Sequence, residues 1–252
     1  MQASNIDDGT ERFPWLPSGF DVETKDVGGD HVFLFIGPVL SSQLAWADEI
    51  LTAEEHDRAS RFVFDLHRNR FRFRRAVLRK ILAHWQSVDP TDIRLIPNAW
   101  GKLFLNSRAR EKSPQFNLSH SGDAIAIATS SSTEIGIDIE LHRPLPEIES
   151  MAQMVMHAQE LEVWQKLPLD DRSHWFFNLW AIKEAVLKCI GCGLAIEPAS
   201  FATNPGAPLG ARQSLELIDP NGIAWQVEVR LIDSFAGFSS ALAKRIRPRQ
   251  RS

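Results

Sequence analysis

The sequence predicts an α+β protein that consists of two subdomains. Strand-like runs are followed by helical stretches in two successive blocks, and the blocks meet near residues 106–120. The 252 residues are enough to bury a sizeable core in each unit. We therefore expect four regions along the chain: a polar leader over residues 1–30, an N-terminal subdomain over 31–115, a C-terminal subdomain over 116–243 and a basic tail over 244–252.

The first block is expected to hold a buried strand, a helical stretch and a short second strand. The apolar run over residues 31–36 has the length of a strand. From Thr52 to about Trp85 apolar residues recur, some at spacings of three and four, which indicates helix. Basic residues fill much of that stretch, and they suit either a solvated helix face or a site for a phosphorylated ligand. The short strand is expected over 103–105.

The second block is expected to begin and end with strands and to hold helices between them. Two adjacent strands joined by a short polar turn suggest an antiparallel hairpin over residues 124–140. Two glycines after the second helix are expected to stop it. The expected elements are strands over 124–129 and 134–140, helices over roughly 147–166 and 171–190, strands over 215–218 and 223–231 joined by Asp219-Pro-Asn-Gly222, and a last strand over 238–243.

The composition excludes several classes of protein. Hydrophobic residues make up 44% and charged residues 24%, which is typical of a globular chain. The net charge of −4 gives no general argument for nucleic-acid binding, and we expect none. No apolar run reaches the roughly 20 residues of a membrane span, and no signal peptide is visible, so we expect a cytoplasmic protein without membrane segments. Cys189 and Cys192 lack the further ligands of a zinc site and are interpreted as structural thiols.

The stretch Gly136-Ile-Asp-Ile-Glu140 carries two carboxylates on one face of a predicted strand. Side chains alternate along a strand, so Asp138 and Glu140 point the same way, with Cα atoms about 7 Å apart and Gly136 leaving room beside them. Two such acids are often only the solvated face of a strand. They are also the oxygen ligands that Mg²⁺ or Mn²⁺ prefers, so the strand alone leaves both interpretations open.

A predicted helix supplies a third acid. Trp180, Glu184 and Lys188 recur every four residues and share one stripe. A Glu–Lys pair at this spacing is usually a surface ion pair, but the tryptophan suggests that this face is covered. Glu184 would then complete a three-carboxylate metal site, and Lys188 would neutralise a phosphate oxygen. His120 lies in a turn of small polar residues that suits an anion, although a lone histidine is more often structural.

These stretches together resemble the 4′-phosphopantetheinyl transferases, specifically their larger, monomeric class. The order and spacing of the motifs carry the resemblance, which spans roughly residues 50–240. It implies two similar α+β subdomains related by a pseudo-twofold axis, with coenzyme A in the cleft between them. It also implies transfer of the 4′-phosphopantetheine arm to a serine of an apo acyl or peptidyl carrier protein. The matching motifs are Trp100-Gly-Lys102, Phe116-Asn-Leu-Ser-His-Ser-Gly122, Gly136-Ile-Asp-Ile-Glu140, Trp180-Ala-Ile-Lys-Glu-Ala-Val-Leu-Lys188 and Gly191-Cys-Gly-Leu194.

The resemblance also assigns roles to individual residues. It makes Asp138, Glu140 and Glu184 the ligands of Mg²⁺ or Mn²⁺, and it places Lys188 near the pyrophosphate of coenzyme A. Glu184 is in addition our candidate for the base that accepts the serine proton. The remaining implied contacts to coenzyme A are His120 with Ser119 near the 3′-phosphate, Arg58 at the 3′-phosphate, and Gly101 and Lys102 on the adenine side.

Two other functions remain as alternatives. A metal-dependent phosphodiesterase could use the same two strand acids with a distant glutamate, although the charge balance argues against a nucleic-acid substrate. A non-catalytic module could bind coenzyme A or a carrier without transfer, but the presence of all three acids argues against a decayed site. We expect a monomer, because an internal pair of subdomains makes one chain self-sufficient.

Overall fold

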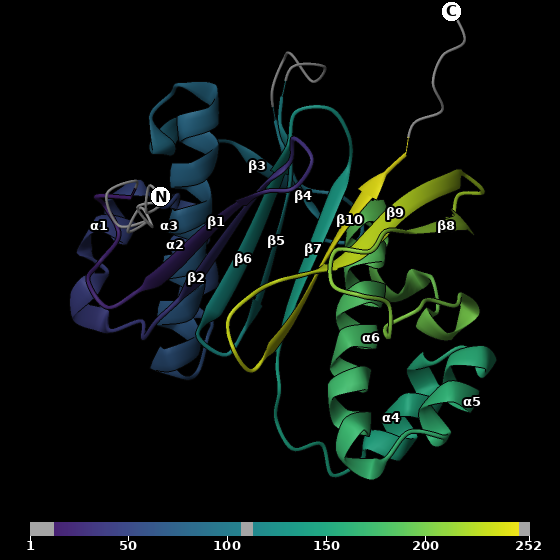
Figure 1. Cartoon of the computed structure of the whole chain (residues 1–252). Helices are drawn as coiled ribbons and strands as arrows, with labels where there is room; N and C mark the ends of the chain where they lie inside the picture. The colour runs from purple at the N-terminus through teal and green to yellow at the C-terminus, as the bar shows by residue number, and fades with distance from the viewer. Residues whose placement is uncertain (1–12, 107–112, 247–252) are drawn as a thin grey trace, which may run out of the picture.

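Two antiparallel four-stranded sheets form the centre of the protein, each with a long helix on one face (Figure 1). The structure is a computed structural model and describes residues 13–106 and 113–246. The first sheet has the order β1-β2-β6-β5 and the second β7-β10-β9-β8. The strands are β1 Asp21–Asp26, β2 His31–Ile36, β5 Gln115–Ser121, β6 Ala124–Ser130, β7 Ile135–Leu141, β8 Gln213–Ile218, β9 Ala224–Ile232 and β10 Phe238–Arg245.

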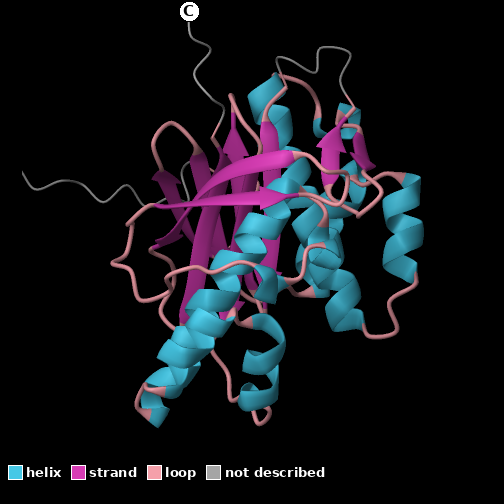
Figure 2. Cartoon of the chain, turned by 90° about the vertical axis from the view of Figure 1, so that its right-hand side faces the viewer, coloured by secondary structure: helices cyan, strands magenta, loops and turns pink. Residues whose placement is uncertain are grey.

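The helices differ greatly in length. α3 and α6 each have 22 residues, whereas the others are short. A small sheet of β3 and β4 lies apart from the two large sheets (Figure 2). The helices are α1 Ala45–Ile50, α2 Ala53–Ser60, α3 Asp65–Gln86, α4 Ile148–Val155, α5 Ala158–Gln165 and α6 Leu169–Ile190, with β3 over Leu95–Pro97, β4 over Leu103–Leu105 and single 3₁₀ turns at Ser41–Gln43, Pro90–Asp92, Gly193–Ala195 and Pro198–Ser200.

Local sequence explains where the helices near the cleft begin and end. The Thr52 hydroxyl accepts a hydrogen bond from the Glu55 amide, and the Glu55 carboxylate accepts one from the Thr52 amide, so a capping box starts α2. Gly191 ends α6 with a φ of 84°, a left-handed conformation that glycine adopts without a steric penalty. The predicted stop of this helix is therefore confirmed.

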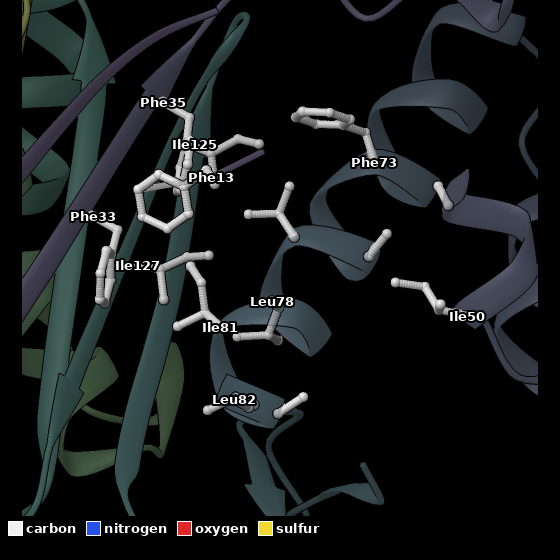
Figure 3. Packing of buried hydrophobic residues seen from close by; sticks show 14 of the residues in the cluster. Phe13, Phe33, Phe35, Ile50, Phe73, Leu78, Ile81, Leu82, Ile125 and Ile127 are labelled. Atoms are coloured by element: carbon white, nitrogen blue, oxygen red, sulfur yellow. The ribbon is translucent and has the colours of Figure 1, made fainter. Parts of the chain in front are cut away.

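Each long helix buries one face of its own sheet. The apolar side of α3, including Phe73 and Ile81, packs against Phe33 and Ile127 of the first sheet (Figure 3). α6 packs in the same manner on the second sheet, where Val227 and Ala241 belong to its apolar cluster. The repeated unit of sheet plus long helix confirms the predicted α+β fold of two similar subdomains.

The two sheets share a third apolar cluster on their remaining faces. Side chains alternate between the two faces of a strand, so those on the face away from the long helix can pack against the other sheet. This contact includes the three isoleucines that alternate with the acids of β7. The cluster comprises Val32, Leu34, Ala124, Ala126 and Ala128 from the first sheet and Ile135, Ile137, Ile139, Ile232 and Leu242 from the second.

The structure corrects the predicted leader and tail. Residues 21–26 form β1, which pairs with β2, and both Phe13 and Phe20 are buried in the first core. These two aromatic side chains anchor a stretch that is otherwise polar, so the leader prediction is wrong for the described part of it. Lys244 and Arg245 belong to β10 rather than to the predicted basic tail. Residues 1–12 and 247–252 lie outside the described residues.

The structure also corrects the predicted hairpin and subdomain boundary. β6 pairs with β5 and β2, and β7 pairs with β10, so residues 124–129 and 134–140 do not form the predicted hairpin. β5 and β6 belong to the first sheet, although the predicted boundary at residue 116 placed them in the second subdomain. The tight turn in this region is Gly122-Asp123, and Gly122 has a φ of 57°.

Candidate active site between the subdomains

A cleft of about 770 Å³ is lined by residues of α2, α3, the β3–β4 turn, β5 and the C-terminal end of α6. Its lining is strongly basic in a chain whose net charge is −4. A positive cavity of this kind concentrates an anionic ligand. The predicted residues that line it are Arg58, Gly101, Lys102, His120 and Lys188, and the further basic residues are Arg74, Arg75, Arg79 and Arg94.

Asp138 is a buried carboxylate with one unpartnered oxygen. Its side chain is 1% exposed, and its Oδ1 accepts hydrogen bonds from Ser119 Oγ at 2.7 Å and from Lys188 Nζ at 2.5 Å. Its Oδ2 is buried and has no hydrogen-bond partner among the described residues. Burial raises the pKa of this carboxyl, and Lys188 and Ser119 oppose that rise. A buried acceptor without a partner fits a cation that binds there.

Glu140 is held at both oxygens by neighbouring side chains. Trp180 Nε1 donates to its Oε1 at 3.2 Å, and Ser121 Oγ donates to its Oε2 at 3.0 Å. Burial and the negative charge of Asp138 raise the pKa of Glu140 to about 7. The predicted cover over the tryptophan stripe is thus present, and Trp180 contacts an acid directly.

Lys188 lies among the three predicted acids. Its Nζ is 2.5 Å from Asp138 and 3.8 Å from Glu184 Oε2. Burial alone would lower the pKa of Lys188, but the carboxylates of Asp138, Glu184 and Glu140 outweigh burial and raise it. Burial also raises the pKa of Glu184, and the charge of Asp138 adds to that rise. The described residues contain no group of three acidic, histidine or cysteine side chains already gathered as a metal site.

Gly136 allows α6 to lie directly on β7. A Cβ atom at this position would be 2.1 Å from the Ala185 carbonyl oxygen and 2.3 Å from the Cys189 amide nitrogen. Only glycine permits such a close approach of two backbones. The approach brings Glu184 and Lys188, on the facing side of α6, to the acids of β7.

The two subdomains meet at the acids through the side chains of β5. The Asn117 side-chain oxygen accepts from the Ile137 amide at 2.9 Å, Ser119 bonds Asp138, and Ser121 bonds Glu140. The residue numbers of the bonded partners increase together along β5 and β7, so the two strands run parallel. Polar side chains thus replace a backbone ladder between the sheets and fix the position of both acids. Ser121 was not among the predicted site residues, although it lies one strand period beyond Ser119.

Comparisons with known proteins match both halves of the chain. The profile described as "4′-phosphopantetheinyl transferase superfamily" matches residues 134–241, and that described as "4′-phosphopantetheinyl transferase, N-terminal" matches residues 39–132. The 4′-phosphopantetheinyl transferase HetI of Nostoc sp. is 37% identical over 77% of this chain and 82% of its own length. The chain belongs to the 4′-phosphopantetheinyl transferases.

Two more distant relatives extend the match. The human L-aminoadipate-semialdehyde dehydrogenase-phosphopantetheinyl transferase is 29% identical over 64% of this chain and 55% of its own length. The 4′-phosphopantetheinyl transferase Sfp of Bacillus subtilis is 26% identical over 60% of this chain and 65% of its own length. The predicted enzyme class is confirmed: this phosphopantetheinyl transferase uses coenzyme A and acts on a carrier protein. None of its described helices has the length and apolar character to cross a bilayer.

The ammonium of Lys102 in the transferase contacts the protein backbone. It donates to the carbonyl oxygens of Ile135 at 3.1 Å, Lys188 at 2.7 Å and Cys189 at 2.9 Å. The side chain therefore ties the β3–β4 turn to the end of α6, and only its stem remains to contact a ligand. Gly101 shapes the same turn with a φ of 88°.

Arg74 is a cleft residue that the sequence analysis did not single out. Its guanidinium has no hydrogen bond or ion pair within residues 13–106 and 113–246, and burial with the charges of Arg70 and Arg75 lowers its pKa to about 10. His120 opens into the same cleft. His120 keeps an exposed part, but desolvation by the surrounding protein and the charges of Arg74, Lys188 and Arg70 lower its pKa to about 4. Its imidazole is therefore neutral near pH 7.

Proposed function

We propose that the transferase moves the 4′-phosphopantetheine arm of coenzyme A to a serine hydroxyl of an apo acyl or peptidyl carrier protein. The reaction is proposed to depend on Mg²⁺ (or Mn²⁺) and to release adenosine 3′,5′-bisphosphate. One observation carries the metal assignment: one oxygen of Asp138 is buried without a partner among the described residues, and the other contacts Lys188, which lines the basic cleft. Asp138, Glu140 and Glu184 fit a hard divalent cation, because their oxygens are the ligands that such ions prefer.

The chemistry asked of the protein is mainly positioning and charge neutralisation. The serine oxygen forms a bond to the phosphorus on the pantetheine side of the diphosphate, and the bond from that phosphorus to the bridging oxygen breaks. The serine proton must be removed, and we assign this role to Glu184, whose raised pKa makes it a better base than an ordinary glutamate. A bound divalent ion would supply further neutralisation of the charge that develops on the diphosphate.

Lys188 is assigned to the diphosphate. Its ammonium stays protonated because of the surrounding carboxylates, and it lies at the boundary between the acids and the cleft. A fixed positive charge there stabilises the leaving phosphate without any change in protonation. Ser119, which contacts both Asp138 and Lys188, holds these two groups in place.

The cleft is assigned to the nucleotide part of coenzyme A. Arg58 has its guanidinium 5.4 Å from the centre of the Phe71 ring and forms none of the described ion pairs, so it is available to a phosphate. His120 is proposed to meet the 3′-phosphate as a neutral hydrogen-bond donor. Gly101 and the stem of Lys102 are proposed to border the adenine.

A mass measurement on the carrier tests the proposed reaction. The transferase is mixed with coenzyme A, Mg²⁺ and apo carriers from fatty-acid, polyketide and peptide synthesis. We expect one carrier class to gain the mass of a single phosphopantetheine arm, and chelation of the metal to stop the gain. Hydrolysis of a phosphodiester without any gain, or tight coenzyme A binding without transfer, would contradict the proposal.

We also propose a cytoplasmic monomer. Both halves of the site come from one chain, because β5, β7 and α6 together hold the acids. Sedimentation at several concentrations is expected to give a mass near the 28.4 kDa of the chain. A stable trimer would be incompatible with this part of the proposal.

A further inference from the structure

We infer that Arg74 determines the preference of the transferase for coenzyme A over its 3′-dephospho form, by binding the 3′-phosphate directly. The inference rests on the proposed function, because it requires that the cleft holds coenzyme A. Arg74 lies on α3 and lines the cleft together with His120 of β5. It is absent from the motifs that relate the chain to its family.

Arg74 differs from every other arginine of its helix. Each of the others forms an ion pair with a carboxylate, whereas Arg74 forms none with a described residue. Carboxylates thus neutralise the other arginines of α3, whereas the positive charge of Arg74 in the cleft has no carboxylate partner among the described residues. The paired arginines are Arg68 with Asp65, Arg70 with Asp123, Arg72 with Asp48, and Arg75 and Arg79 with Glu55.

An unpaired guanidinium in this position is unfavourable in the free protein. Burial and two neighbouring positive charges, Arg70 and Arg75, lower its pKa to about 10, yet it remains charged near pH 7. Arg74 is half-buried, so part of its hydration is lost without the compensation of a partner. A phosphate removes this cost, and the planar guanidinium can donate two parallel hydrogen bonds to it.

The location of Arg74 selects which phosphate it meets. Lys188 contacts Asp138 and Glu184, and the proposed function places the diphosphate there. Arg74 lies on α3, and its charge acts on His120, which the proposed function assigns to the 3′-phosphate. Coenzyme A carries one further phosphate, the monoester at the 3′ position of its ribose. That group is therefore the ligand of Arg74.

Two variants on the same helix test the inference. Arg74→Gln removes the unpaired charge, and Arg72→Gln is the matched control, because Arg72 is paired with Asp48 and does not line the cleft. The value of kcat/KM is measured for coenzyme A and for 3′-dephospho-coenzyme A with one carrier. We expect Arg74→Gln to lower kcat/KM for coenzyme A by about 10- to 100-fold, the range for hydrogen bonds to charged groups, and to change the dephospho value less than about twofold. Arg72→Gln is expected to keep the ratio of the parent protein.

Calorimetric titration of both nucleotides into the same proteins separates this inference from the proposed reaction, because it needs no carrier. If the parent binds coenzyme A more tightly than the dephospho form and Arg74→Gln removes that difference, the inference stands even if no carrier is modified. An equal loss for both nucleotides, or no loss for either, overturns it. Melting temperature reports folding, and Arg74→Gln is expected to melt no lower than the parent, because it removes an unpaired charge.

Discussion

Replacement of Gly136 by alanine tests the contact that assembles the site. The new Cβ atom would lie 2.1 Å from the Ala185 oxygen, 2.3 Å from the Cys189 nitrogen and 2.8 Å from the Cys189 Cα. Ordinary contacts of this kind need about 3.5 Å, so α6 must move away from β7 by roughly 1 Å. Overpacking against side chains costs about 1–3 kcal/mol, and here both obstacles are backbone, so we expect about 3 kcal/mol. That loss corresponds to a decrease in melting temperature of about 6–12 °C for a chain of this size.

The same movement should affect transfer more than folding. α6 carries Glu184 and Lys188, and misplacement of reacting groups by about 1 Å can cost about 10²-fold in rate. Thermal unfolding and carrier modification are measured on Gly136→Ala and on Gly206→Ala. The nearest atoms to a Cβ at Gly206 are 3.5 and 3.8 Å away, so this control should behave as the parent. Equal melting temperatures and equal rates for the two variants would refute the close contact.

Three further predictions concern single side chains. Ser121→Ala removes a hydrogen bond to one oxygen of Glu140, so we expect the Mg²⁺ concentration at half-maximal rate to rise several-fold and to recover in Ser121→Thr. Equal metal dependence of both variants would argue against a role of Ser121 in positioning Glu140. Lys102→Met leaves three carbonyl oxygens without their donor, so we expect the free energy of unfolding to decrease by about 2 kcal/mol. Denaturant titration measures this loss, and an unchanged unfolding midpoint would be inconsistent with the described hydrogen bonds. The pKa of His120 is about 4 in the folded protein and 6.5 in the unfolded chain, so the unfolded chain binds more protons between these values and the free energy of unfolding decreases as the pH drops from 6.5 toward 4. His120→Asn should make the free energy of unfolding depend less on pH in this range, and a dependence equal to that of the parent would count against the lowered pKa.

The acids could be found from the sequence because each group lies within one regular element. The strand period places Asp138 beside Glu140, and the helix period places Glu184 beside Lys188. In the structure Lys188 contacts both Asp138 and Glu184, while the gathering of the three acids around one ion stays a prediction. Only Gly136 hinted at the close approach of the two elements, because its missing side chain leaves room at the acids.

Features that depend on distant partners could not be predicted. Three strands separated by short turns allow either β5–β6 or β6–β7 pairing, and the choice is made by contacts with β2 and β10. The run of arginines in α3 does not reveal which one lacks a carboxylate, since every paired carboxylate except that of Asp65 comes from outside α3. Lys102 lies in a family motif, yet its ammonium bonds residues about 33 to 87 positions away.

Manganese binding to the transferase with coenzyme A tests the central assignment most directly. Mn²⁺ is titrated into the parent protein and into Asp138→Asn, and free Mn²⁺ is followed by electron paramagnetic resonance. Thermal unfolding of both proteins is measured alongside, because Asp138→Asn also removes the ion pair with Lys188 and a folded variant is needed for the comparison. We expect one tightly bound Mn²⁺ per parent chain and affinity at least about tenfold weaker in Asp138→Asn, in line with the effect of disturbing a metal site. Equal affinity in the two proteins would contradict the assignment of these acids to a divalent ion.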